Sequence, residues 1–204
     1  MQLIRNGLDL TIIPDLHRRT LVWIHGYGDT AELFGQDFIE APLIPDCKVV
    51  LPTAEEGRRG SQMCRSWYDR SDPNTIESSA RRICSILQEE SKYTDTIFIG
   101  GFSQGAVMSL VCGLCKYTGP ISGIIALSGF MMNYPIPASR KSIPVLAYHG
   151  AQDNRISLSS STESFKKYLK GVNYHLEVHP TMPHEVYSEE YEFIRNWVKS
   201  TLNI

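Results

Sequence analysis

Short apolar runs alternate with helix-like patterns along most of this chain of 204 residues. The runs end at glycine, proline or polar residues, as strands buried on both faces do. They cover residues 21–24, 49–51, 96–99, 124–127 and 145–148, and a half-buried strand with alternating polarity is predicted at 174–178. Strands that alternate with helices predict an α/β fold with a mostly parallel central sheet and helices on both of its faces.

The predicted helices lie between these runs. The clearest begins at Asp72-Pro73, a side-chain cap followed by proline at the first helical position. Helices are also predicted near Thr30, with Asp29 as the cap, after Ser103, and over residues 158–169. The last helix is predicted from apolar and aromatic residues at steps of four, three and four, namely Tyr187, Tyr191, Ile194 and Val198.

The length and charge of the chain restrict its class. A chain of this length fits a single domain, which we expect to span residues 1–204. Lys and Arg total 20 and Asp and Glu total 22, which gives a net charge of −2 without a long basic run. Capture of nucleic acid by a basic surface is therefore not expected.

The termini and cysteines favour a cytoplasmic protein. The N-terminus lacks the apolar stretch of a signal peptide, and no run approaches the roughly 18 apolar residues of a membrane span. Five cysteines at irregular spacing disfavour a disulfide framework. Because N-terminal myristoylation and C-terminal prenylation motifs are lacking, we expect at most transient membrane contact.

The segment Gly101-Phe102-Ser103-Gln104-Gly105 fits the pattern Gly-x-Ser-x-Gly. It follows a predicted strand and precedes a predicted helix, which is the context of a nucleophilic serine on a sharp turn. A serine hydroxyl needs a base, and that base needs an orienting carboxylate. The sequence therefore predicts Ser103 as a nucleophile, although an ordinary glycine-rich turn is the alternative.

Two later segments supply the acid and the base. Asp153 follows the strand at 145–148 and is expected at the same carboxyl edge of the sheet as Ser103. His184 lies in the loop before the last helix and is the preferred base, with His179 as the second choice. Asp29 and Asp69 are rival acids, but neither follows a late strand.

The loop His25-Gly26-Tyr27-Gly28-Asp29 follows the first predicted buried strand. An oxyanion hole needs two N–H donors. We assign them to the backbone N–H groups of Tyr27 and Gln104, the residue after the nucleophile.

Assembled, these segments make the chain resemble the acyl-protein thioesterase and carboxylesterase/lysophospholipase family of α/β-hydrolases. The resemblance covers about residues 21–197. It rests on the segments already quoted and on Leu51-Pro52-Thr53-Ala54, Met63, Ser66-Trp67-Tyr68-Asp69, Ala126-Leu127-Ser128-Gly129 and His149-Gly150.

The resemblance implies the α/β-hydrolase fold without a large lid domain. It also implies a serine hydrolase that needs no metal or organic cofactor. The expected reaction removes long-chain acyl groups such as palmitoyl from protein cysteines, so S-acylated proteins or acyl lipids are the expected partners. A lysophospholipase or small-molecule carboxylesterase is the alternative, and an inactive lipid- or protein-binding module is a remote one.

Three departures from the family pattern concern the substrate. Tyr27 stands where the family usually has Leu, Phe130 replaces a usual Trp, and residues 55–60 are charged instead of apolar. The apolar segment 130–137 is expected to line an acyl groove, although packing into the core is the alternative. We expect Phe130, Met131, Met132 and Trp67 to contact the substrate.

Two further patterns are set aside. Cys112 and Cys115 form a Cys-x-x-Cys without a second pair at zinc spacing, so core packing is expected. His184-Glu185 begins like a zinc-protease motif, but Ser188 stands where the second histidine is needed.

Overall fold

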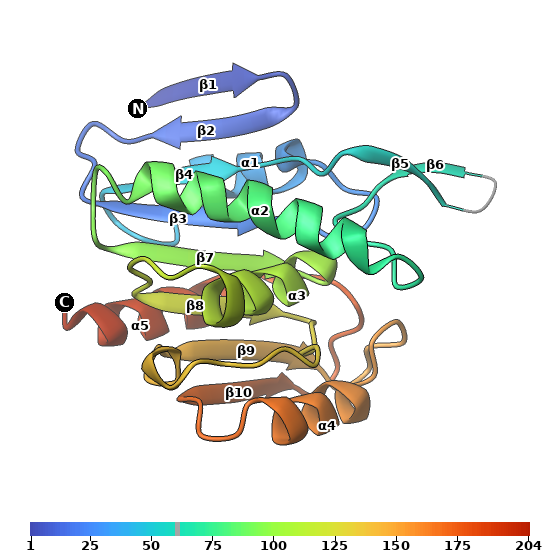
Figure 1. Ribbon diagram of the computed structural model, residues 1–204. Helices are drawn as coiled ribbons and strands as arrows, with labels where there is room; N and C mark the ends of the chain where they lie inside the picture. The colour runs from blue at the N-terminus through green and yellow to red at the C-terminus, as the bar shows by residue number, and fades with distance from the viewer. Residues whose placement is uncertain (60–61) are drawn as a thin grey trace.

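A computed structural model describes residues 1–59 and 62–204. Its centre is an eight-stranded sheet with the strand order β1-β2-β4-β3-β7-β8-β9-β10 (Figure 1). The six strands from β4 to β10 in this order pair in parallel, whereas β2 pairs antiparallel with both β1 and β4. The strands are β1 (Gln2–Asn6), β2 (Asp9–Ile13), β3 (Arg19–Ile24), β4 (Cys47–Leu51), β7 (Ile97–Phe102), β8 (Gly123–Leu127), β9 (Val145–Gly150) and β10 (Tyr174–His179).

Helices cover both faces of the sheet, as the alternating pattern predicts. Figure 1 shows α2, α3 and α4 on the near face, and α1 and α5 on the far face. Each face has its own cluster of buried side chains. The helices are α1 (Ala31–Glu40), α2 (Pro73–Glu90), α3 (Gln104–Val111), α4 (Leu158–Tyr168) and α5 (Ser188–Leu202), with a π-helical turn η1 (Cys112–Lys116) and a 3₁₀ turn η2 (Ala138–Arg140).

All six predicted strands are present, and four strands were not predicted. The first two, β1 and β2, form an antiparallel hairpin at one edge of the sheet. The others, β5 (Glu56–Arg59) and β6 (Gln62–Arg65), form a separate hairpin that projects from the body (Figure 1). The charged segment 55–60 thus contributes β5, and its last residue lies outside the described residues.

The helix predicted near Thr30 begins with a different cap from the one expected. Thr30 itself is the N-cap residue of α1, and it makes no side-chain capping bond. The backbone N–H of Ala31 instead donates to the hydroxyl of Thr53 at 2.9 Å. The prediction of Asp29 as the cap is therefore wrong, because a distant loop satisfies this N–H group.

Cysteine packing and membrane character can also be described. Cys112 is fully buried in the core, and Cys115 is partly buried against it, as expected. All five cysteines are free thiols. No helix in the part of the chain that the structure describes is long and apolar enough to cross a membrane.

A buried carboxyl group lies in the first turn of α5. Glu190 is 0% exposed and accepts a hydrogen bond from the backbone N–H of Tyr187 at 2.9 Å. Its Oε1 has no hydrogen-bond partner among residues 1–59 and 62–204. Burial raises the pKa of Glu190 from 4.5 to about 8, and the bond from Tyr187 opposes this only in part.

Glu190→Gln should remove a pH-dependent part of the free energy of unfolding. Between pH 4.5 and about 8 the unfolded chain loses this proton while the folded chain keeps it. The free energy of unfolding of the wild type therefore falls as pH rises through this window, by at most about 1.4 kcal/mol per pH unit. Glutamine has no proton to lose and can still accept from Tyr187.

Urea denaturation at several pH values between these limits measures the effect. The difference in free energy of unfolding between variant and wild type should shift in favour of the variant with rising pH. Parallel pH profiles for the two proteins would contradict the assignment of a protonated, buried Glu190.

Candidate active site

Ser103 stands at a sharp turn between β7 and α3 and has a positive φ of 56°. Such a conformation is strained for a residue other than glycine, so the surrounding packing must hold it. A Cβ atom at Gly105 would lie 1.9 Å from the carbonyl oxygen of Ile24 on β3. Glycine at this position lets α3 approach β3 closely, as the Gly-x-Ser-x-Gly pattern requires. The turn places Ser103 on a cavity of about 770 Å³.

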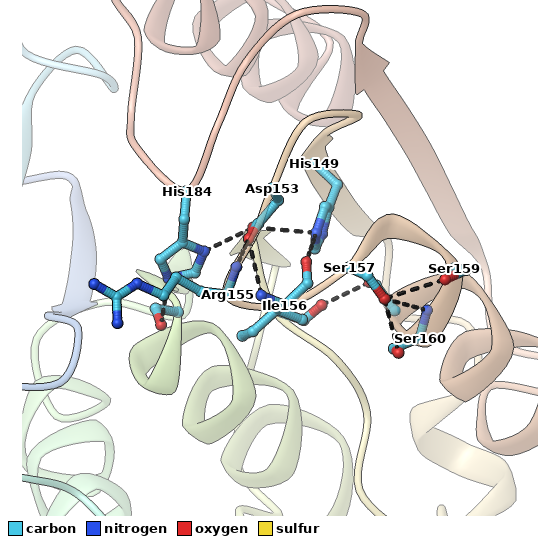
Figure 2. A network of polar contacts seen from close by, with 11 residues as sticks. His149, Asp153, Arg155, Ile156, Ser157, Ser159, Ser160 and His184 are labelled. Atoms are coloured by element: carbon cyan, nitrogen blue, oxygen red, sulfur yellow. Dashed lines mark hydrogen bonds and ion pairs between the residues drawn. The ribbon is translucent and has the colours of Figure 1, made fainter.

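His184 lies between Ser103 and Asp153. Its Nδ1 is 2.7 Å from Oδ2 of Asp153 (Figure 2). Its Nε2 is 2.9 Å from Oγ of Ser103. The carboxylate accepts from Nδ1–H, which leaves Nε2 as the acceptor for the serine hydroxyl. The side chain of His184 is 15% exposed and that of Asp153 is fully buried. With the hydroxyl, the imidazole and the carboxylate arranged in this order, a proton can pass from the hydroxyl to the imidazole.

The carboxylate of Asp153 is held by its own loop, and a second histidine lies close to it. Its Oδ1 accepts from the backbone N–H groups of Arg155 at 2.9 Å and Ile156 at 2.8 Å. His149 places Nε2 3.3 Å from Oδ2, with a 2.8 Å bond to the carbonyl of Ile156 (Figure 2). Burial opposes ionisation of Asp153, but the bonds from His184, Ile156 and Arg155 outweigh it and lower the pKa. Asp153 is therefore a fixed, ionised acceptor for His184.

The loop that carries His184 lies against the end of β9. A Cβ atom at Gly150 would be 2.0 Å from the carbonyl oxygen of Met182, so only glycine permits this approach. The same carbonyl accepts from the backbone N–H of Gln152 at 3.1 Å, and Met182 is fully buried. These contacts fix the loop two residues before the imidazole.

The rival acids and the rival base occupy other positions. Nδ1 of His179 accepts from the backbone N–H of Thr181 at 3.3 Å. Asp29 and Asp69 line the cavity, but Nδ1 of His184 is directed at Asp153. Burial raises the pKa of Asp29, and a bond from the backbone of Gly26 opposes this shift.

The two residues expected to form the oxyanion hole belong to separate segments beside the cavity. Tyr27 and Gln104 both line it. Gln104 is the first residue of α3, and the first N–H groups of a helix have no acceptor within the helix. His25 supports the other loop, because Nδ1–H donates to the carbonyl of Gly26 at 2.6 Å and Nε2 accepts from the N–H of Ala54 at 2.9 Å. Burial lowers the pKa of His25 to about 4, which keeps one donor and one acceptor on the ring.

Of the four residues expected to contact the substrate, one lies on the wall of the cavity. Phe130 lines the cavity. Met131 and Trp67 are each 1% exposed in the core, and Met132 is partly buried against the same core. Contact of Met131 or Trp67 with a substrate is therefore not supported by this arrangement. In segment 130–137 Met131 is buried, the residues at 132, 134 and 136 are partly buried against the core, and those at 133, 135 and 137 are exposed.

Trp67 instead supports two segments beside the cavity through hydrogen bonds. Its indole N–H donates to the carbonyl of His25 at 2.9 Å, and its backbone N–H donates to Oε1 of Gln104 at 3.0 Å. Nε2 of Gln104 also donates to the carbonyl of Tyr68 at 3.0 Å. Hydrogen-bond partners that are distant in sequence leave no local pattern, so these supporting contacts, and that of His149, are not evident from the sequence.

Known proteins resemble this chain in sequence and in fold. A family model described as phospholipase/carboxylesterase matches residues 13–202. Acyl-protein thioesterase 1 of Schizosaccharomyces pombe is 30% identical over 178 residues, which are 75% of this chain and 76% of the relative. Acyl-protein thioesterase 1 of Saccharomyces cerevisiae is 26% identical over 97% of this chain and 99% of the relative. The crystal structure of Zea mays acyl-protein thioesterase 2 has a TM-score of 0.82 at 25% identity and covers 97% of this chain and all of that one.

Proposed function

Because this chain belongs to the phospholipase/carboxylesterase family, we propose that it is a serine hydrolase that cleaves acyl thioesters or esters through Ser103. The observation that carries the proposal is the pair of contacts made by His184, at 2.9 Å to the hydroxyl of Ser103 and at 2.7 Å to Asp153. A nucleophile, a base within hydrogen-bond reach and a carboxylate that orients the base are the minimum set for acyl transfer.

In the proposed acylation step, Oγ of Ser103 attacks the acyl carbonyl carbon while its proton passes to Nε2 of His184. The negative charge that develops on the carbonyl oxygen is stabilised by the backbone N–H groups of Gln104 and Tyr27. The ionised carboxylate of Asp153 stabilises the imidazolium. Collapse of the intermediate breaks the bond to the thiolate or alkoxide, which takes the proton from Nε2 and leaves an acyl-enzyme.

Deacylation repeats the same steps with water. His184 removes a proton from a water molecule, which attacks the acyl group on Ser103. The second tetrahedral intermediate releases the carboxylic acid and returns the proton to Oγ of Ser103. Apart from one water molecule, the groups that take part in this cycle all belong to the chain, and the cycle leaves the enzyme unchanged.

We propose S-acylated proteins, including palmitoylated ones, as the substrates, because the relatives with the quoted similarity bear the name acyl-protein thioesterase. Depalmitoylation fits a reducing cytoplasm, which the five free thiols favour, and needs only transient contact with membranes. Hydrolysis of lysophospholipids or small esters is the second candidate. The charged side chains of Asp29, Asp69, Arg70 and Arg155 on the cavity wall do not suit a long alkyl chain, so they favour small esters within this second candidate.

Turnover of three substrates by the purified protein tests the proposal. An S-palmitoyl peptide, a lysophospholipid and a short-chain ester are compared by kcat/KM, and acylated Ser103 is sought by mass spectrometry after rapid acid quenching. We expect hydrolysis of the thioester and an acyl adduct on Ser103. Binding of all three without turnover would contradict the proposal and support a binding module, whereas turnover of the ester alone would support the second candidate.

A further inference from the structure

Two arginines line the cavity that contains Ser103. Arg155 lies in the loop after β9, and Arg70 lies in the loop before α2, so two separate elements bring the cations to one space. Both side chains are exposed. Within residues 1–59 and 62–204, neither guanidinium forms an ion pair with a carboxylate of the chain.

Arg70 is held on the cavity wall by an aromatic neighbour. Its guanidinium carbon lies 5.1 Å from the centre of the Phe130 ring, within the range of a cation–π contact. Phe130 and Tyr68 both line the cavity, so the contact with Phe130 places the cation at its wall.

Arg155 is anchored beside the catalytic groups through its backbone. Its backbone N–H donates to Oδ1 of Asp153 at 2.9 Å. This bond holds the backbone of Arg155 next to the carboxylate. Figure 2 shows the side chain extending from this point past His184. A substrate group bonded close to the scissile carbonyl would therefore lie within reach of this guanidinium.

The two carboxylates of the cavity have donors from their own loops. Oδ1 of Asp69 accepts from the backbone N–H of Ser71 at 2.9 Å and from its hydroxyl at 2.7 Å. The carboxylate of Asp29 accepts from the backbone of Gly26. Each carboxylate therefore already has a local partner, whereas the planar donors of the two guanidiniums are directed to no carboxylate of the described chain.

We propose that Arg70 and Arg155 form an anion-binding subsite beside Ser103, and that the preferred substrates carry a carboxylate or phosphate close to the scissile acyl bond. The proposal rests on the proposed hydrolase function and names the substrate class for it. Guanidinium groups bind carboxylates and phosphates through paired, charge-assisted hydrogen bonds. The subsite binds the anion on either the acyl side or the leaving-group side of the bond.

Matched substrate pairs test the proposal and locate the anion. The para-nitrophenyl hemiester of glutarate is compared with para-nitrophenyl pentanoate for the acyl side. For the leaving-group side, meta-carboxyphenyl acetate is compared with phenyl acetate. Lysophosphatidate is compared with the monoacylglycerol of the same chain for a phosphate. We expect kcat/KM of the anionic member to exceed that of its neutral partner by about tenfold or more in at least one pair.

Arginine variants then connect that preference to the subsite. In the preferred pair, Arg70→Gln and Arg155→Gln are each expected to lower the ratio of the two kcat/KM values by about tenfold. Substitution of either arginine by Lys should keep part of the preference for the anionic substrate. Arg18→Gln is the matched control, because Arg18 precedes β3 at the opposite end of the parallel strands and should leave the ratio unchanged. Added salt should also lower the ratio.

The outcomes separate this proposal from the proposed function. Ratios at or below one in all three pairs, with neutral esters still hydrolysed through Ser103, would overturn the anion subsite alone. An unchanged ratio in the double variant of Arg70 and Arg155 would overturn the assignment of these residues. Failure of the wild type to hydrolyse any ester or thioester would overturn both proposals.

Discussion

Ser103→Ala should lower kcat by a factor of about 10⁶ and leave a folded protein, because the nucleophile and its base act as one unit. The hydroxyl of Ser103 hydrogen-bonds to Nε2 of His184 at 2.9 Å, and the residue is 9% exposed at the base of the cavity. Alanine leaves water as the attacking group, and the remaining rate comes from substrate binding and the backbone N–H groups. Steady-state kinetics with the best substrate of the panel measures the loss.

The control for this variant removes a hydroxyl group elsewhere. Ser160 lies exposed in α4 and does not line the cavity, so Ser160→Ala should keep wild-type kinetics. Circular dichroism and thermal unfolding should show that Ser103→Ala keeps the fold. The substitution should not relieve the backbone strain at this position, because the Cβ atom of alanine at φ 56° meets the same steric conflict as that of serine. A folded variant that retained a tenth of the wild-type activity would rule out Ser103 as the nucleophile.

The strands that the sequence predicts are those with a strong burial pattern. All five residues of β8 are buried, and β7 has five of its six residues buried, so each reads as a continuous apolar run. β1 is exposed at all five positions and depends on its pairing with β2, so no periodic burial signal marks it. Pairing with another strand, rather than burial, accounts for β1, whereas β2 was missed although its burial alternates, with Leu10 and Ile12 buried.

The same distinction applies to the site. Ser103, Asp153 and His184 were predicted to meet at one place. Their order in the chain and their loops at the carboxyl edge of a parallel sheet were sufficient for this prediction. Composition alone did not reveal which way segment 130–137 faces: Phe130 turns to the cavity and Met131 to the core. Arg155 was not predicted as a site residue, because a single cation in a loop belongs to no periodic pattern. Its position two residues after Asp153 could nevertheless have indicated that it lies near the site.

His184→Ala should reduce kcat nearly as much as Ser103→Ala, since it removes the group that takes the proton of the nucleophile. The imidazole is the only described link between the hydroxyl and the carboxylate, with bonds of 2.9 Å and 2.7 Å. Its loss also leaves Asp153 with one fewer donor, while Arg155 and Ile156 still bond to Oδ1. We therefore expect a folded variant with the rate of the serine variant.

His179→Ala is the matched control, because His179 is a histidine of the preceding segment and the other candidate for the base. Its Nδ1 accepts from the backbone of Thr181, and its ring packs against Tyr187, so its loss should change thermal stability slightly and leave kcat close to the wild-type value. The double variant Ser103→Ala with His184→Ala should be no slower than either single variant, since both remove the same step. An inactive His179→Ala beside an active His184→Ala would show that the base had been assigned to the wrong histidine, and additive losses in the double variant would show that Ser103 and His184 act in separate steps.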